Sequence, residues 1–188
     1  MLDKLRPYNL YFIQKASPGE GDAFDYALIY KFYTERTEEY QRLKYIIRIE
    51  VFEDVFALKF YAARDRKMED KYNRIIKAHN YSGVMRIFLT CAFLILKLHE
   101  EFPTYSFVIN GAESNDLEGN KVEGKNSTQR FRIYRIFALQ VFGREKFEHY
   151  QYPSVSSYML VNRNGDEDIE SKAERIKDMF IQKGFDMM

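Results

Sequence analysis

The N-terminal part of the chain alternates between apolar and polar side chains. Residues 24–34 place aromatic and aliphatic side chains at every second position, and residues 43–51 repeat the pattern. Because successive side chains of a strand point to opposite faces of a sheet, both segments are predicted to be half-buried strands. A third strand is predicted at 55–62. Only Glu53 and Asp54 separate it from the second strand, which is short enough for a hairpin and makes that pair antiparallel.

A long apolar segment at 84–101 predicts a helix that is apolar nearly all round. Its polar positions up to residue 98, which are Arg86, Thr90 and Lys97, form one narrow stripe on such a helix. A helix of this composition is expected at the centre of a fold, where it covers the apolar face of the sheet. Pro103 is expected to end it.

Shorter patterns complete the expected organisation. Further strands are predicted at 8–13, 105–109, 146–152 and 156–161. Helices are predicted at 127–143 and, with an amphipathic stripe, at 166–183. Residues 68–76 also show helical spacing.

These elements predict an α+β fold in a single domain of residues 1–188. We expect an antiparallel sheet packed on one face by the helices at 84–101 and 127–143, because consecutive strands without an intervening helix argue against a doubly wound fold. The segment 111–126 is expected to be a flexible loop. The C-terminal helix within 165–188 is expected to be peripheral.

Composition limits the classes of partner and compartment. The chain has 29 basic and 28 acidic side chains, for a net charge of +1, so no overall field draws it to nucleic acid or to an anionic membrane. The single cysteine, Cys91, lies in an apolar run and is expected to be a buried thiol, which fits a reducing compartment. No signal peptide is visible, and the longest apolar run, 87–96, is shorter than the roughly 20 residues that span a bilayer. We therefore expect a cytoplasmic protein without a membrane segment.

The stretch 111–143 carries the most local chemistry. Residues 119–126 read GNKVEGKN, which is one residue short of the phosphate-binding pattern Gly-x-x-x-x-Gly-Lys-Ser/Thr. Asn126 stands where that pattern needs a hydroxyl, and about eight residues separate Asn110 from Gly119, whereas a phosphate-binding loop follows its strand directly. The sequence therefore does not predict a nucleotide cofactor.

A weaker hypothesis remains for the start of the helix at 127–143. Ser127 or Thr128 is a suitable N-cap, and the first turn would expose free backbone N–H groups next to several cations, which can hold an anion or a nucleic-acid phosphate. The candidate residues are Lys125, Ser127, Thr128, Arg130, Arg132 and Arg135. On a helical wheel Arg130 falls on the apolar side, so it either pairs with a carboxylate or points into the mouth of the loop. The alternative is a capped helix whose arginines form surface ion pairs.

Part of this region resembles an uncharacterised bacterial family of small α+β proteins. Residues 108–111 read VING and residues 127–135 read STQRFRIYR; members of the family carry a strand, then Gly-Ser-Thr, then a helix with Arg-x-Arg-Leu-Tyr. The similarity covers about residues 70–150, with Asn126 in place of the glycine and the segment 111–126 as an insertion. The resemblance implies a small α+β domain and brings no established activity or catalytic residues.

The histidines do not predict a metal site. None of His79, His99 and His149 has a second histidine or a cysteine at ligand spacing, so no metal is expected. The predicted strands also carry basic residues interleaved with tyrosines, a composition that can bind single-stranded nucleic acid or can be an ordinary solvated sheet face. These basic residues are Lys31, Arg36, Arg42, Lys44, Arg48, Lys59 and Arg64.

The sequence favours binding over catalysis. We expect a non-enzymatic interaction module with a protein or nucleic-acid partner and no cofactor; a homodimer through a sheet edge or the C-terminal helix is one such arrangement. The alternative is a nuclease-like enzyme that acts on a phosphate-containing substrate through Lys125, Arg130 and Arg132. Such an enzyme needs an acid or a base beside these cations. The groups that would have to converge with them are Glu113, Asp116, Glu118 or His149.

Overall fold

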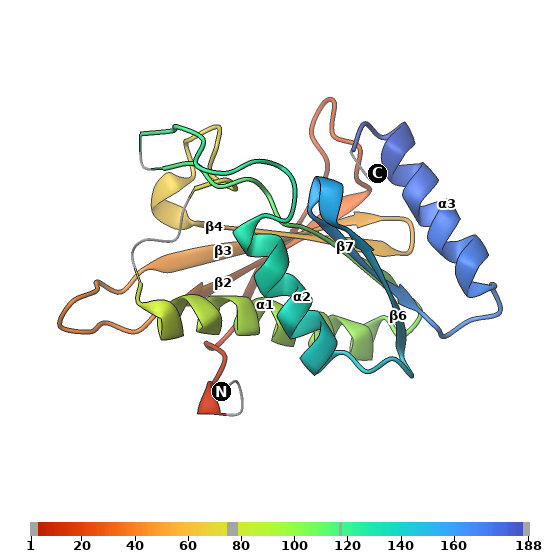
Figure 1. The fold of residues 1–188 in the computed structure, drawn as a ribbon, viewed down its shortest axis with the longest axis horizontal. Coiled ribbons are helices and arrows are strands. Elements are labelled where there is room, and N and C mark those ends of the chain that lie inside the picture. Colours follow the sequence, from red (N-terminus) through yellow and green to blue (C-terminus); the bar gives the residue numbers. More distant parts are fainter. Residues whose placement is uncertain (1–3, 75–78, 117, 186–188) are drawn as a thin grey trace.

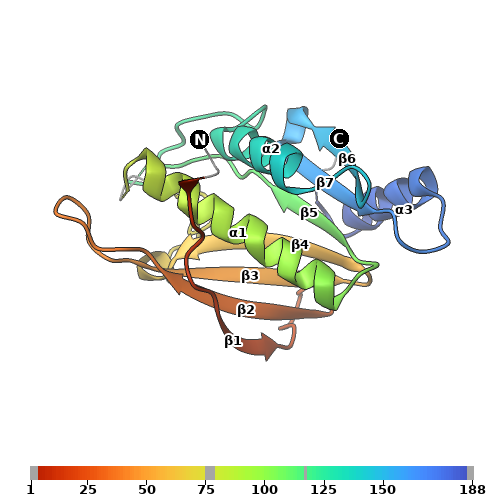
Figure 2. The ribbon, with the colours of Figure 1, turned by 90° about the horizontal axis from the view of Figure 1, so that it is seen from below.

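A seven-stranded sheet organises the chain. In the computed structural model, which describes residues 4–74, 79–116 and 118–185, the strands lie in the order β1-β2-β3-β4-β5-β7-β6 (Figure 1 and Figure 2). The strands are β1 (Tyr11–Ala16), β2 (Tyr26–Tyr33), β3 (Lys44–Phe52), β4 (Val55–Ala62), β5 (Ser106–Asn110), β6 (Phe147–Tyr152) and β7 (Ser157–Asn162). The helices are α1 (Tyr81–Glu101), α2 (Gln129–Val141) and α3 (Ile169–Gln182), with 3₁₀ turns at Ala63–Asp65 and Pro153–Val155. The predicted α+β single-domain fold is confirmed.

The hairpin between β3 and β4 has the predicted antiparallel form. Phe52 pairs with Val55 across the turn, and Glu53 takes the left-handed conformation with a φ of 55°. Neighbouring strands in the sheet are antiparallel except β4 and β5, which are parallel. The chain between these two strands passes through α1, and a parallel pair requires such a long crossover. The sheet is therefore mostly antiparallel, not wholly so as expected.

The helices α1 and α2 cover one face of the sheet, as Figure 2 shows for α1 over β2, β3 and β4. Asn80 caps α1 by accepting a hydrogen bond from Gly83 N at 2.8 Å, so the helix begins at Tyr81, earlier than the expected residue 84. By length and composition α1 could cross a bilayer, and half of its most apolar window is buried inside the domain. Its packing against the sheet and α2 accounts for the apolar character of this buried half.

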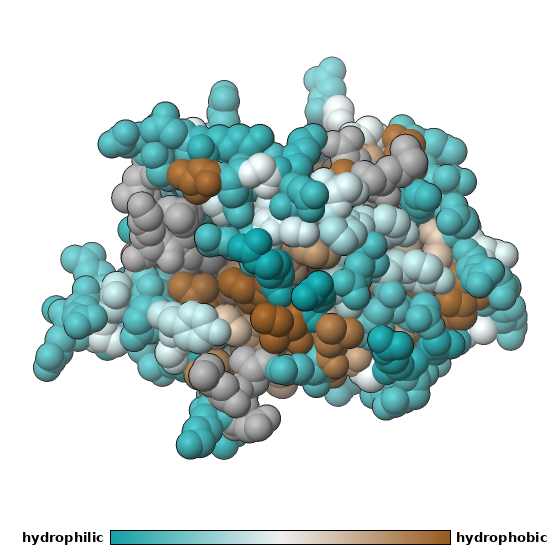
Figure 3. Space-filling view, in the orientation of Figure 1, coloured by the Kyte–Doolittle hydropathy of each residue, from teal (hydrophilic) through white to brown (hydrophobic). Residues whose placement is uncertain are grey.

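The outer surface of α1 and α2 also carries apolar side chains. Phe93 is 49% exposed, and Ile136 and Leu139 are 43% and 48% exposed. In Figure 3 hydrophobic residues gather over the part of the surface where these two helices lie. The helices are therefore less polar on their solvent side than is usual for a helix on a sheet.

The C-terminal helix α3 covers the opposite face of the sheet. Its side chains form a second core cluster with side chains from five strands, β2, β3, β4, β5 and β7. The buried residues that α3 contributes are Ala173, Ile176, Met179 and Phe180. Because this apolar stripe is fully used in packing, α3 is a layer of the domain, where a peripheral position was expected.

Capping groups set both ends of α3. Asp168 accepts a hydrogen bond from Ser171 N at 3.0 Å, so the helix begins at Ile169 and not at residue 166. Gly184 follows the last turn with a φ of 84°, a conformation that glycine adopts without a steric penalty. Gly184 thus allows the chain to turn away at the end of α3.

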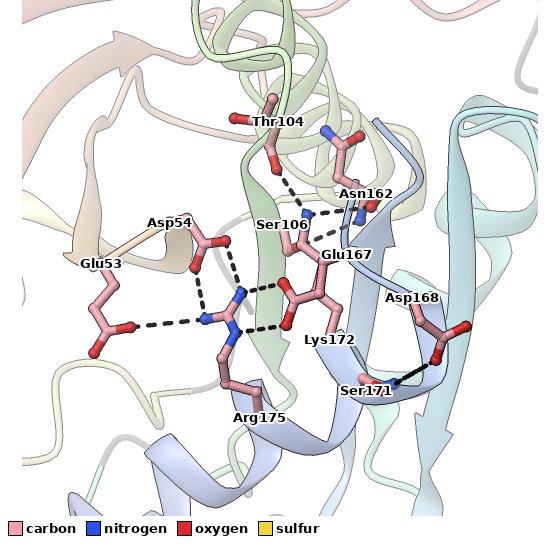
Figure 4. A network of polar contacts seen from close by, with 10 residues as sticks. All are labelled: Glu53, Asp54, Thr104, Ser106, Asn162, Glu167, Asp168, Ser171, Lys172 and Arg175. Carbon is pink, nitrogen blue, oxygen red and sulfur yellow. Dashed lines mark hydrogen bonds and ion pairs between the residues drawn. The ribbon is translucent and has the colours of Figure 1, made fainter. Parts of the chain in front are cut away.

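A buried polar cluster joins β7, α3 and the loop after α1. The side-chain amide nitrogen of Asn162 donates hydrogen bonds to Pro103 O at 2.7 Å and to Tyr105 O at 2.9 Å. Lys172 Nζ donates to Thr104 O at 3.0 Å and to Asn162 O at 3.3 Å (Figure 4). Burial lowers the pKa of the Lys172 ammonium group. The side chains of Asn162 and Lys172 thus supply the hydrogen bonds to the carbonyl groups of the loop after α1.

Arg175 connects α3 to the hairpin between β3 and β4. Its Nη1 and Nη2 donate to the two carboxylate oxygens of Asp54 at 3.0 Å and 2.9 Å, and its Nε and Nη2 donate to the two of Glu167, both at 3.0 Å (Figure 4). Paired N–H donors of this kind give the strongest arginine–carboxylate contacts. The ion pairs of Arg175 with Asp54 and Glu167 therefore add to the apolar packing that holds α3 on the sheet.

The helical spacing at 68–76 did not produce a helix in the described residues. Residues 66–74 contain turns and an isolated β-bridge between Arg74 and Asn115, while 75–78 lie outside the described residues. This segment and the polar loop after β5 lie side by side in Figure 1, and Asn115 N donates a hydrogen bond to Asn73 O at 2.7 Å. Backbone hydrogen bonding therefore connects the irregular segment 66–74 to the loop after β5.

Candidate functional site

The start of α2, which the sequence suggested as an anion site, is held by a capping threonine. Thr128 Oγ1 accepts a hydrogen bond from Phe131 N at 3.2 Å and donates one to Gly111 O at 2.6 Å. Thr128 N donates to Ser156 Oγ at 2.8 Å. These bonds connect the end of β5, the start of α2 and the turn before β7, so buried Thr128 has a structural role.

A carboxylate of the chain occupies the N-terminus of α2. Glu123 Oε2 accepts a hydrogen bond from Gln129 N at 2.9 Å, and Glu123 Oε1 accepts one from Ser114 N at 3.0 Å. A negative charge is favoured at this end of a helix because the backbone N–H groups point toward it. An external anion would have to displace Glu123.

Arg130 points into the protein and away from the mouth of the loop. It is buried, and its terminal nitrogens donate hydrogen bonds to the carbonyl oxygens of Tyr72 and Arg74. Its guanidinium carbon also lies 5.4 Å from the ring centre of Phe60, and burial lowers the pKa of the guanidinium. Its partners are therefore backbone carbonyls of the irregular segment 66–74, where a carboxylate or an external ligand was expected.

The other cations near this helix start lie on the surface. Arg132 Nη1 donates a hydrogen bond to Ser127 O at 2.8 Å, which closes the first turn of α2. Arg135 and Lys125 are exposed. The structure thus brings Arg132 and Ser127 together but directs Arg130 elsewhere, so the predicted cluster does not surround one point.

The acids and the base that an enzyme would need do not contact these arginines within the described residues. Asp116 accepts hydrogen bonds from amides of its own loop, including Glu118 N at 3.0 Å. Glu113 forms an ion pair with a loop lysine at 2.7 Å, and His149 Nδ1 lies 2.8 Å from the hydroxyl of a buried tyrosine. The convergence required by the nuclease-like alternative is not present among them.

The histidines lead to a prediction about pH. Burial lowers the pKa of His79, His99 and His149. Their pKa in the unfolded chain is about 6.5, so below that value the unfolded chain binds more protons than the folded one. The free energy of unfolding should therefore be steady above about pH 7 and should fall as the pH drops through about 6.5.

Thermal unfolding at about pH 7.5 and about pH 5.5 measures this effect. Carboxyl groups with a lowered pKa, such as Glu35 beside Arg86, affect stability only below about pH 4.5, outside that window. Equal melting temperatures at the two pH values would show that the histidines titrate alike in both states.

Two of the basic residues predicted on the sheet are neutralised by a buried carboxylate. Arg48 and Lys59 lie opposite each other on β3 and β4, where two like charges repel. Buried Glu50 lies between them, with Oε1 3.0 Å from Arg48 Nε and Oε2 2.6 Å from Lys59 Nζ. The positive field that a nucleic acid would need is therefore weaker on this face than the sequence suggested.

A cavity of about 470 Å³ lies beside the start of β1 and the end of β2. A volume of this size is in the range of ligand pockets. It is lined by Pro7, Tyr8, Asn9, Tyr11, Tyr33, Thr34, Glu35, Arg36, Arg42 and Arg86. We call it the Tyr–Arg pocket. Its walls come from the segment before β1, the connection from β2 to β3, and α1.

Arg86 of α1 holds the walls of the Tyr–Arg pocket together. Its Nη1 and Nη2 donate hydrogen bonds to the two carboxylate oxygens of Glu35 at 2.6 Å and 3.0 Å, and its Nε donates to Arg6 O at 2.9 Å. Its guanidinium carbon lies 4.1 Å from the ring centre of Tyr8. The hydrogen bond from Arg86 lowers the pKa of the Glu35 carboxyl group. α1 therefore connects the N-terminal segment to the end of β2.

A second arginine lies on a tyrosine in the same pocket. The guanidinium carbon of Arg42 is 4.7 Å from the ring centre of Tyr33, and the ring of Tyr11 meets that of Tyr33 edge-on at 6.5 Å between centres. Arg36 is exposed. With three arginines and one glutamate, the lining side chains carry an excess of two positive charges. The pocket therefore offers the guanidinium N–H groups of Arg36 and Arg42 in a positive potential.

Patterns in the sequence identified the three arginines of this pocket, but not its other lining residues, and did not show that they meet. Arg36 and Arg42 were among the basic residues of the predicted strands, and Arg86 was a polar position on the apolar helix. Glu35 and Arg86 are 51 residues apart. Only the packing of α1 on the sheet brings them together, so no local pattern could reveal the pocket.

Within residues 4–74, 79–116 and 118–185, no group of three or more His, Cys, Asp or Glu side chains is arranged to hold a metal ion. Comparison with protein-family models, with curated proteins and with solved structures found no match. The function is therefore inferred from the site, and the family resemblance over residues 70–150 stays a prediction.

Proposed function

We propose that the chain is a non-enzymatic binding module whose ligand carries an anionic group, and that the Tyr–Arg pocket is its binding site. The observation that carries this proposal is the convergence of Arg36, Arg42 and Arg86 on one cavity that contains a single carboxylate. Arg86 is paired with Glu35, so the excess positive charge of the lining comes from Arg36 and Arg42. An anion that enters the pocket would be attracted by this charge and would gain charge-assisted hydrogen bonds.

The arrangement of the arginines favours a carboxylate or a phosphate group. Arg86 and Arg42 each lie over a tyrosine ring, so ring faces that could stack on nucleic-acid bases are covered. A guanidinium group presents a planar fork of N–H donors that matches the oxygens of these anions. An acidic group is therefore a better match to the pocket than a run of unpaired bases.

The nuclease-like alternative has less support. It depended on Arg130, which is buried against backbone carbonyls, and on a helix start that Glu123 occupies. The Tyr–Arg pocket, in contrast, combines cations with free volume.

Simple anions should bind in the pocket, and Arg42→Gln should weaken that binding about tenfold, because a hydrogen bond to a charged group contributes about 1.5–3 kcal/mol. The measurement is a titration of the ¹⁵N-labelled chain with sodium acetate or inorganic phosphate at constant ionic strength. Backbone amide shifts are expected at residues 33–36, at Arg42 and at Arg86.

Arg135→Gln is the matched control, since Arg135 is an exposed arginine on α2, away from the pocket lining. It should leave the affinity unchanged. Shifts confined to residues 123–135, or a loss of binding in Arg135→Gln alone, would move the anion site to the start of α2 and contradict the proposal.

A further inference from the structure

The Tyr–Arg pocket adjoins an edge of the sheet that no strand within residues 4–74, 79–116 and 118–185 covers. In the described part of the chain, β1 is the first strand in the sheet order and pairs with β2 alone. Tyr11, Phe12 and Ile13 of β1 are 48%, 56% and 41% exposed. An exposed apolar edge strand is a template for another extended chain, because its backbone N–H and C=O groups lack partners on one side.

The pocket lies at the N-terminal end of this edge strand. Tyr11 is both the first residue of β1 and part of the pocket lining, and the lining continues into residues 7–9. Tyr8 N donates a hydrogen bond to Thr90 Oγ1 at 2.9 Å, so the chain before β1 turns toward α1 and away from the line of the strand. The open edge and the cationic cavity are therefore continuous.

The position of the positive charge selects the direction of an added strand. A chain that runs antiparallel to β1 brings its C-terminal end to Tyr11 and onward into the pocket, whereas a parallel chain brings its N-terminal end there. The excess positive charge of the lining attracts a C-terminal carboxylate and repels an N-terminal ammonium group. The geometry therefore distinguishes the two ends of a peptide.

Building on the proposed function, we infer that the ligand is the acidic C-terminal end of an extended segment from a partner protein. The segment pairs antiparallel with β1, and its terminal carboxylate or an acidic side chain near it enters the Tyr–Arg pocket. The register between β1 and β2 shifts between Phe12 and Gln14, which marks a bulge at Ile13. A bulge limits regular pairing, so the contact is centred on the end of β1 nearest the pocket.

A second copy of this chain is a poorer occupant of the same edge. If two copies paired antiparallel through β1, Lys15 of one copy would lie near Tyr11 of the other and thus near three arginines. The charges repel in that arrangement, whereas an acidic segment complements them.

The test compares two N-acetylated peptides of alternating threonine and valine on the full ¹⁵N-labelled chain. One peptide ends in glutamate with a free carboxylate, and its twin ends in glutamine amide. The acidic peptide should shift the amides of residues 11–13 as well as those of the pocket, and should slow their hydrogen exchange. The twin should bind at least about tenfold more weakly because it lacks the charge-assisted bonds.

Phe12→Glu separates the edge strand from the pocket. Phe12 is an exposed position, so the variant should fold. It should weaken the binding of the acidic peptide by like-charge repulsion and leave the binding of acetate unchanged. Arg42→Gln should weaken the binding of both acetate and the acidic peptide.

The outcomes distinguish this inference from the proposed function. If acetate shifts the pocket but the acidic peptide leaves residues 11–13 unperturbed, or binds no better than its amide twin, the inference is wrong and the anion pocket stands. If neither acetate nor the peptide perturbs the pocket, both fail. Self-association that perturbs β1 in the absence of peptide would identify a second copy as the occupant and overturn the inference.

Discussion

Gly111→Ala is expected to destabilise the domain by about 3 kcal/mol or more, because the added methyl group has no room. A Cβ atom on Gly111 would lie 2.5 Å from Phe131 N and 2.8 Å from Phe131 Cα. These are backbone atoms in the first turn of α2, so they cannot rotate away as a side chain would. The helix would have to move.

Moving α2 would break the contacts that fix it to β5. Gly111 O accepts the hydrogen bond from Thr128 Oγ1 at 2.6 Å, and Gly111 N donates to Ser156 O at 2.8 Å. A shift large enough to relieve the clash would lengthen these bonds and open the packing of Phe131, which is 1% exposed. The glycine is thus explained by the close approach of a helix and not by a bound phosphate.

Urea denaturation followed by circular dichroism measures the effect, with Gly124→Ala as the matched control. Gly124 lies in the same polar loop, and a Cβ atom there would meet nothing within 4 Å. The control should change the free energy of unfolding by less than about 1 kcal/mol. Equal stabilities of the two variants would show that α2 can shift freely at this point.

Asn162→Ala should cost about 3 kcal/mol, since it removes a fully buried polar side chain together with the hydrogen bond that it donates to Tyr105 O. The Asn162 side chain donates to Pro103 O and Tyr105 O, and its own oxygen accepts from Asn164 N at 2.8 Å. The residue is fully buried, at 0% exposed, so water cannot replace these bonds without a rearrangement of the cluster. Lys172 Nζ depends on the same chain segment for its acceptors.

Asn164→Ala provides the comparison for this second variant. Asn164 has the same side chain and also donates to Pro103 O, at 2.8 Å, but it is exposed. Its loss should cost less than about 1 kcal/mol, because water can take its place. If thermal unfolding gave Asn162→Ala and Asn164→Ala the same melting temperature, the buried cluster would not be a major source of stability.

Local pattern was sufficient for most of the elements. Ile47 and Ile49 are fully buried on one face of β3, as the alternation predicted, and Pro103 follows α1 as expected. The same alternation puts Glu50 of the 43–51 segment on the polar face, where exposure to solvent is expected, but Glu50 is buried. A carboxylate at that position becomes tolerable only because Lys59 of the next strand and Arg48 pair with it, and strand register is not visible in a single segment.

The candidate site was harder to predict for a related reason. Arg130 was correctly placed on the apolar side of α2, but its partners are carbonyl groups of an irregular segment whose path no periodicity describes. The parallel pairing of β4 and β5 and the meeting of Glu35 with Arg86 both follow from where α1 packs. Contacts that depend on the packing of a whole helix against a sheet lie beyond the reach of spacing rules.

The position of α3 has a consequence for the chain during its synthesis. The sheet face that this helix covers, with Phe52, Val55 and Met159 fully buried, is built from strands that precede it in the sequence. A nascent or truncated chain that stops before Ile169 therefore presents a finished sheet with one bare apolar side. Exposed apolar surface makes such intermediates prone to aggregation, so completion of the last helix removes the largest part of this exposed surface from the sheet.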